Sequence, residues 1–221
     1  MAWPWADVAE ITFLTLRVTF FATLIGTLLG VPLGAAIGLR TRPTLTLFRV
    51  LLYTLYSLPP VIAGLVGYLV LSGSGPLGFL ELIFTPTAII IVESLLATPL
   101  IAGLTIAALA EVPPNIREAI QASGANVPLR HWTLIREARF GIIAAIMVGW
   151  GRSLAEVAGA MIVGGNIRHG TRTLGTAILQ VTGQGDFHLA LALGAILLVI
   201  ALASVLVLIR LQTLNTRRET S

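Results

Sequence analysis

Five long runs of apolar residues, separated by short polar segments, dominate the pattern along the chain. They cover residues 12–39, 47–71, 86–110, 139–163 and 187–211. Each run reaches the roughly 20 helical residues that cross a hydrocarbon core about 30 Å thick. The pattern therefore predicts an all-α integral membrane protein with five transmembrane helices, in which residues 1–221 form a single membrane domain.

The first run carries a glycine at every fourth position. Gly26, Gly30, Gly34 and Gly38 fall on one face of a helix. Such a stripe of small residues lets the backbone of another helix approach closely. We expect the approaching helix to belong to the same chain, with dimerisation through this face as the alternative.

The second run is interrupted by two prolines near its middle. Pro59 and Pro60 each lack a backbone N–H, so a helix cannot keep its hydrogen bonds there. Within a membrane, such a break is tolerated only where neighbouring protein or a water-lined path satisfies the freed backbone groups. We therefore place Pro59 and Pro60 in a translocation pathway or gate.

The longest polar interruption, residues 111–137, separates the third run from the fourth. It begins with a Pro-Pro pair, which cannot continue the preceding helix. We expect Asn115 to cap a short helix over Ile116–Ser123 and Gly124 to end it in a left-handed conformation. Pro128 fits the first turn of a second short helix. The segment thus predicts two short helices around a glycine corner.

The arginines are distributed unevenly between the two sides of the predicted membrane helices. With the N terminus outside, the cytoplasmic segments hold Arg40, Arg42, Arg49, Arg117, Arg130, Arg136, Arg139, Arg210, Arg217 and Arg218, and the external segments hold Arg168 and Arg172. The positive-inside rule therefore predicts an external N terminus, a cytoplasmic C terminus and a cytoplasmic 111–137 segment.

Composition narrows the class of protein further. Apolar residues make up 56% of the 221 residues and charged residues 11%, and the mean hydropathy is +0.93, as is typical of membrane proteins. The basic residues are all Arg, and a P-loop requires a lysine. If ATP drives this protein, another polypeptide hydrolyses it.

Other ligand classes find little support in the composition. The chain has no cysteine, which excludes thiolate metal sites. The arginines flank the apolar runs instead of forming a basic stripe with interleaved aromatic residues, as a nucleic-acid interface would require. We predict no metal, no cofactor and no nucleic-acid partner.

Acidic residues occur inside two of the apolar runs. Arg152 and Glu156 of the fourth run are four residues apart, so on one helix they share a face and can pair, and Ser153 lies beside them. We interpret these three residues as a polar lining of the translocation pathway, with an ion pair that only fixes helix packing as the alternative. Glu93 of the third run also needs a partner or neutralisation, and we favour an interhelical hydrogen bond over a role in transport.

The fourth run ends in residues that do not favour a helix. Gly164, Gly165 and Asn166 are expected to expose backbone groups, and Arg168 and Arg172 follow shortly after them. Backbone N–H groups and guanidinium groups together suit tetrahedral oxyanions. The segment is therefore predicted to form the outer gate or the surface that faces an external partner protein.

Residues 118–124, EAIQASG, resemble the EAA-xxx-G signature of the permease subunits of binding-protein-dependent ABC importers. In that family the segment is a cytoplasmic coupling helix that docks into a groove on the ATPase. The resemblance implies the type I ABC importer permease fold. It also assigns Glu118, Ala119, Gly124 and the neighbouring Arg117 to ATPase coupling.

Residues 151–178 contain GRSLAEV, MIVGGNI and TRTLGTAI, which are similar to segments of tungstate importer permeases, relatives of the molybdate and sulfate permeases. This resemblance implies a multi-pass protein of the prokaryotic plasma membrane. It would move a tetrahedral oxyanion from an extracytoplasmic binding protein to the cytoplasm by ATP-driven alternating access, with tungstate as the first choice and molybdate or sulfate as alternatives. The implied assembly is a homodimer of this chain with two ABC ATPase subunits, embedded in membrane lipid.

Two other classes of protein compete with this interpretation. An intramembrane serine protease would use Ser153 as nucleophile and His188 as base. Ser153, however, lies roughly 15 Å inside its helix at 1.5 Å per residue, whereas His188 stands at the start of the fifth run. A secondary transporter working without ATP would be expected to show inverted repeats, and we find none in the sequence.

Overall fold

The computed structural model of the chain describes residues 5–40 and 45–217, and within these ranges it is helical, without strands. In chain order the elements are α1 (Trp5–Gly38), α2 (Leu45–Tyr56), α3 (Pro60–Leu71), η1 (Gly78–Leu80), α4 (Pro86–Ala110), α5 (Pro114–Ala122), α6 (Val127–Glu137), α7 (Arg139–Leu154), α8 (Ala158–Gly164), α9 (Leu174–Gly183) and α10 (Phe187–Arg217). Arg42 and Arg218, which contributed to the predicted orientation, lie outside the described residues.

The five predicted spans are all present as helices. In the described part of the chain, α1, α4 and α10 are each long and apolar enough to cross a membrane, and the number of spans is five if each of the bent pairs α2–α3 and α7–α8 counts as one span. The prediction of an all-α membrane fold is therefore confirmed.

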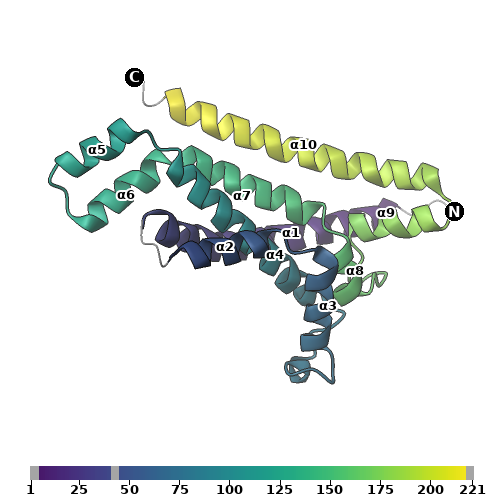
Figure 1. Cartoon of the computed structure of the whole chain (residues 1–221). Helices are drawn as coiled ribbons and strands as arrows, with labels where there is room; N and C mark the ends of the chain where they lie inside the picture. Colours follow the sequence, from purple (N-terminus) through teal and green to yellow (C-terminus); the bar gives the residue numbers. More distant parts are fainter. Residues whose placement is uncertain (1–4, 41–44, 218–221) are drawn as a thin grey trace.

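The most buried helix, α4, packs along α1 through the glycine stripe (Figure 1). A Cβ atom built on Gly30 would lie 2.7 Å from the main-chain oxygen of Thr98, and one built on Gly34 would lie 2.5 Å from that of Ala102. Side chains at these positions would push the two helices apart. The stripe thus serves packing within the chain, as expected.

Two of the spans are sharply bent. The first bend, of 94°, separates α2 from α3 at the proline pair, and this break was predicted from Pro59 and Pro60. The second bend, of 56°, separates α7 from α8, and here the prediction of a continuous helix is wrong. In a continuous helix the N–H of Gly159 would bond to the carbonyl of Ala155, but it donates instead to a carboxylate oxygen of Glu156, at 2.9 Å. A side chain inserted into the backbone ladder is a common cause of a kink.

Helices α5 and α6 form a hairpin that projects from one end of the bundle (Figure 1). Gly124 lies between them with φ +70°, as predicted. Asn126 caps α6 with its side chain, and Pro128 lies in the first turn. The prediction of Asn115 as the cap of the first helix is wrong. That helix already begins at Pro114, because a proline at the first position supplies a helical φ and needs no hydrogen-bond acceptor.

The last long helix, α10, runs beside the bundle and leaves most of its apolar surface exposed (Figure 1). It packs mainly on α9. The indole N–H of Trp150 on α7 donates to the hydroxyl of Ser204 on α10, at 3.0 Å.

Candidate coupling and translocation site

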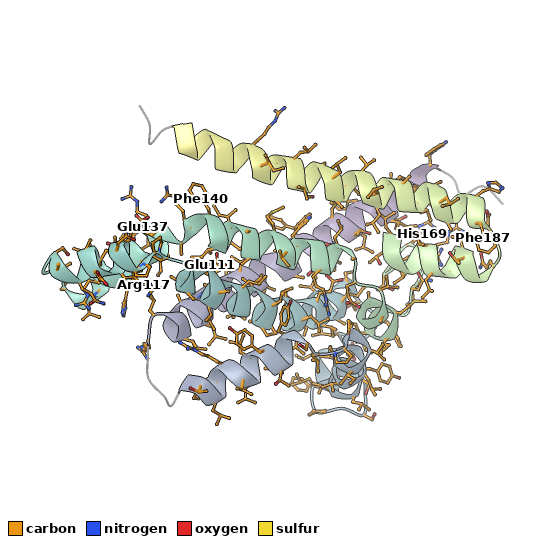
Figure 2. The ribbon with its side chains drawn as sticks, turned by 45° about the horizontal axis from the view of Figure 1, so that its top comes forward. Glu111, Arg117, Glu137, Phe140, His169 and Phe187 are labelled. Carbon is orange, nitrogen blue, oxygen red and sulfur yellow. The ribbon has the colours of Figure 1, made fainter. Side chains whose placement is uncertain are left out.

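The base of the α5–α6 hairpin is bonded to the end of α4. The guanidinium group of Arg117 donates to the main-chain carbonyl oxygens of Leu109 and Val112, the latter at 3.1 Å. The last carbonyls of a helix have no partner within it and attract cations. Figure 2 shows Arg117 at the junction where the hairpin leaves the bundle. Arg117 therefore links the first hairpin helix directly to the central helix of the fold.

The rest of the hairpin offers side chains to a partner. Glu118 and Ala119 are exposed, and α5 buries none of its side chains. On α6, Leu129 and Trp132 are 52% and 64% exposed. Large apolar side chains on a segment outside the membrane are typical of a protein–protein contact. Sequence reasoning missed Trp132, although an exposed aromatic residue in a polar helix could have drawn attention to it.

The two bent spans meet near their bends. A Cβ atom built on Gly64 of α3 would lie 2.9 Å from the Cα atom of Gly159 on α8. A Cβ atom built on Gly159 would lie 3.6 Å from both the main-chain oxygen of Pro60 and a carboxylate oxygen of Glu156. The structure therefore brings together Pro60 and Glu156, two residues predicted from separate runs to belong to the pathway.

Glu156 does not pair with Arg152. Its carboxylate is 7% exposed and accepts the N–H of Gly159. The bend removes Glu156 from the helix that carries Arg152, so the four-residue spacing no longer places them on one face. Within residues 5–40 and 45–217 neither an ion pair nor a hydrogen bond joins the two side chains. The predicted pair is therefore wrong.

A second buried carboxyl group, that of Glu93, lies on α4, which packs against α8. Glu93 is 3% exposed, and its Oε2 atom has no hydrogen-bond partner. The interhelical bond favoured from the sequence is not formed by this oxygen. Ser153 is also buried, at 4% exposure, whereas His188 is exposed on α10. This difference in burial does not support a Ser153–His188 dyad.

The turn after α8 is closed by polar side chains. Gly165 and Asn166 both have positive φ angles, +72° and +50°. The side-chain amide of Asn166 donates to Gln180 at 2.8 Å, and its carbonyl oxygen accepts from Arg172 at 3.2 Å. The hydroxyl of Thr171 donates to the carbonyl oxygen of the last residue of α8. Two of the backbone groups predicted to be exposed, the carbonyls of Gly164 and Asn166, thus accept hydrogen bonds from the side chains of Thr171 and Arg172.

An ion pair and a hydrogen bond join the loop that follows to the start of α1. Arg168 lies 2.6 Å from a carboxylate oxygen of Asp7, and His169 lies 2.7 Å from one of Glu10. Burial, with Arg168 nearby, lowers the pKa of the Arg172 guanidinium in the same loop. Figure 2 shows His169 at the end of the molecule opposite the hairpin. The predicted gate and the predicted coupling segment thus lie at opposite ends.

Comparison with known proteins gives consistent matches over most of the chain. The profile of the family described as "binding-protein-dependent transport system inner membrane component" matches residues 30–221. A probable anion ABC transporter permease protein of Haloferax volcanii is 38% identical over 200 residues, which are 88% of this chain and 86% of the relative. A tungstate uptake system permease protein of Peptoclostridium acidaminophilum is 38% identical over 206 residues, 93% of this chain and 90% of the relative.

Solved transporter structures share the arrangement of helices. A chain of an amino acid ABC transporter gives a TM-score of 0.71 at 20% identity and covers 96% of this chain and 94% of its own length. A chain of the inward-facing MetNI methionine ABC transporter gives 0.75 at 21% identity, with coverage of 96% and 97%. At such identities the likeness concerns the fold alone, and it confirms the predicted type I ABC importer permease fold.

Proposed function

Because this chain belongs to the family of binding-protein-dependent transport system inner membrane components, we propose that it is the permease subunit of an ABC importer for a tetrahedral oxyanion, with tungstate as the first choice. Relatives named as anion and tungstate permeases, 38% identical over most of the chain, support this cargo. Molybdate and sulfate are the alternatives, since they share the shape and charge of tungstate.

The proposed assembly is a homodimer of this chain with two ATPase subunits on separate polypeptides and an extracytoplasmic binding protein. It lies in a prokaryotic plasma membrane, with the N terminus outside and the hairpin in the cytoplasm. The arginine distribution supports this orientation. ATP binding and hydrolysis would drive the permease between its outward-open and inward-open states.

The observation that carries the proposal is the bond between the coupling hairpin and α4. Glu118 and Ala119 would contact the ATPase, while Arg117 holds the same helix to the carbonyl ends of α4. A displacement of the hairpin would therefore reach the central helix of the bundle without passing through a flexible loop. This is the property that a coupling element needs.

The pathway would run along the two bends. Helix breaks inside a membrane occur where protein or a water-filled cavity satisfies the freed backbone groups. Arg152 is half-buried at the end of α7, and in the described part of the chain no carboxylate neutralises it. An unneutralised guanidinium group can attract a passing oxyanion, while Glu156 would keep the anion from binding too firmly.

The test is uptake into proteoliposomes that contain this chain, its ATPase and its binding protein, with tungstate, molybdate and sulfate offered separately. Glu118→Lys should weaken ATPase binding and abolish most uptake, because it reverses a charge in a small docking surface. Glu81→Lys, a charge reversal at an exposed position outside the hairpin, is the matched control and should transport normally. Normal ATPase binding and uptake by Glu118→Lys would show that the hairpin is not the coupling element.

A secondary transporter is the alternative function, and one further measurement distinguishes it from an ABC importer. Uptake is compared with an intact ATPase and with an ATPase that cannot hydrolyse ATP. Loss of uptake with the disabled ATPase supports the ABC importer. Uptake that continues at the same rate would overturn it.

A further inference from the structure

An apolar groove of about 490 Å³ lies between α1, α2 and α4. Helices α1 and α2 both pack on α4 but touch each other little, so α4 forms the floor of the groove. Its walls include Ile25, Leu29 and Leu33 from α1, Leu52 and Leu55 from α2, and Leu95 from α4.

The groove offers almost no hydrogen bonds to a ligand. Its two hydroxyl groups already donate to carbonyl oxygens of their own helix, Ser94 to Ile90 at 2.6 Å and Thr98 to Ser94 at 2.7 Å. A polar ligand or water would therefore lose hydrogen bonds on entering the groove. Its occupant should be a hydrocarbon chain.

The length of the groove corresponds to one leaflet of a bilayer. Ile25, Leu29 and Leu33 line it at one-turn spacing, and from Ile25 to Leu33 a helix rises about 12 Å at 1.5 Å per residue. This lies within the roughly 15 Å that one leaflet contributes to a 30 Å hydrocarbon core. One acyl chain of a single leaflet fits this length.

A positive charge lies at one end of the groove. Arg49 precedes Leu52 by three residues and so faces the same side of α2. Its Nη2 atom donates to the main-chain oxygens of Ile37 and Arg40, at 3.3 and 3.2 Å, which fixes the guanidinium group over the end of α1. Its Nε atom is buried and has no hydrogen-bond partner. Over the described ranges, no carboxylate forms an ion pair with Arg49.

We propose that the groove binds one anionic glycerophospholipid, with an acyl chain along α4 and the phosphate group at Arg49. The positive charge of the half-exposed Arg49 side chain matches a phosphate group, and the apolar walls match an acyl chain. With the proposed orientation, the lipid belongs to the cytoplasmic leaflet, where anionic lipids attract basic side chains. The site concerns the lipid surroundings of the permease and does not depend on the identity of the transported anion.

The test compares two lipids with identical acyl chains, phosphatidylglycerol and phosphatidylcholine, bound to the purified full chain and counted by native mass spectrometry. The parent should retain phosphatidylglycerol about tenfold better, because both lipids carry a phosphate group but the choline cation of phosphatidylcholine offsets its attraction to Arg49. Arg49→Gln should remove this preference. Arg130→Gln, which removes a charge from α6 outside the groove, is the matched control and should keep it.

A second variant tests the proposal even if Arg49→Gln misfolds. Leu29→Trp fills the groove and leaves Arg49 in place, so it should reduce retention of both lipids. Equal retention of the two lipids by the parent would overturn the proposal.

Because the chain has no cysteine, Leu55→Cys can also report on a second copy of the chain. Efficient disulfide cross-linking between copies at this position would show that protein, not lipid, fills the groove, and would overturn the proposal too.

Discussion

Gly64 and Gly159 approach so closely that a Cβ atom on the first would lie 2.9 Å from the Cα atom of the second. The contact joins α3 and α8, which are the second helices of the two bent spans. A backbone atom cannot turn away as a side chain can, so a larger residue at position 64 must move a helix. The geometry of the two bends thus depends on this glycine.

We expect Gly64→Val to lower the stability of the protein by about 1–3 kcal/mol, the usual effect of overpacking a tight contact. Thermal unfolding of the purified protein in detergent measures the change. Gly194→Ala on α10 is the control, because nothing lies within 4 Å of a Cβ atom built there. If Gly64→Val unfolds at the same temperature as the parent, the two spans do not meet as described.

Gly124 is required for its backbone conformation and not for lack of space. A Cβ atom would meet nothing within 4 Å, but the residue has φ +70°. Gly124→Ala should therefore cost about 1–2 kcal/mol for the left-handed backbone and should increase hydrogen exchange in α5 and α6. Gly183→Ala has equal space without a positive φ, so it should not destabilise the protein. Equal behaviour of the two variants would show that the corner tolerates another conformation.

The sequence predicted the elements whose signals are local. The third predicted span, 86–110, coincides with α4, because Thr85 caps it and Pro86 opens it. The proline pair predicted the bend between α2 and α3, because Pro59 and Pro60 cannot donate the hydrogen bonds that would continue the helix. Hydropathy and proline act on the residues around them, so these features need no knowledge of tertiary contacts.

The features that the sequence could not predict depend on individual contacts, in which a side chain bonds to a particular backbone group or pairs with a charge far away in the chain. The bend before α8 has no proline and follows from the bond between Glu156 and Gly159. The ion pair of Arg168 with Asp7 joins residues 161 positions apart. The bonds of Arg117 to Leu109 and Val112 form only because the end of α4 lies beside it. No spacing in the chain encodes these three contacts.

Arg117 should transmit motion rather than bind the ATPase. Arg117→Gln removes a charge-assisted link to α4, so we expect faster hydrogen exchange in α5 and a loss of stability of about 1 kcal/mol, since the side chain is half-exposed. ATPase binding should persist, while the amount of anion imported per ATP hydrolysed falls. Arg40→Gln, at an exposed position just after α1 and outside the hairpin, should leave both quantities unchanged. Loss of ATPase binding by Arg117→Gln would instead make Arg117 a docking residue.

Glu156 should be needed as a hydrogen-bond acceptor, and not as an ion-pair partner. Glu156→Gln keeps a carbonyl oxygen for the N–H of Gly159, so its stability should stay close to that of the parent. Glu156→Ala leaves that N–H buried without a partner and should cost about 1–3 kcal/mol. Thermal unfolding in detergent distinguishes the two variants. A loss of stability with Glu156→Gln as large as with Glu156→Ala would show that the charge itself matters.

The last prediction separates Arg152 from Glu156. Because the bend keeps the two side chains apart, the effects of Arg152→Leu and Glu156→Gln on stability should add in the double variant to within about 0.5 kcal/mol. Uptake should behave differently: Arg152→Leu should transport poorly while remaining folded, because it removes the guanidinium group that attracts the anion, and Glu156→Gln should not restore transport. Both quantities are measured on the same reconstituted variants. A coupling energy well above that limit, with transport recovered in the double variant, would mean that the two charges pair after all and that Arg152 serves packing and not the pathway.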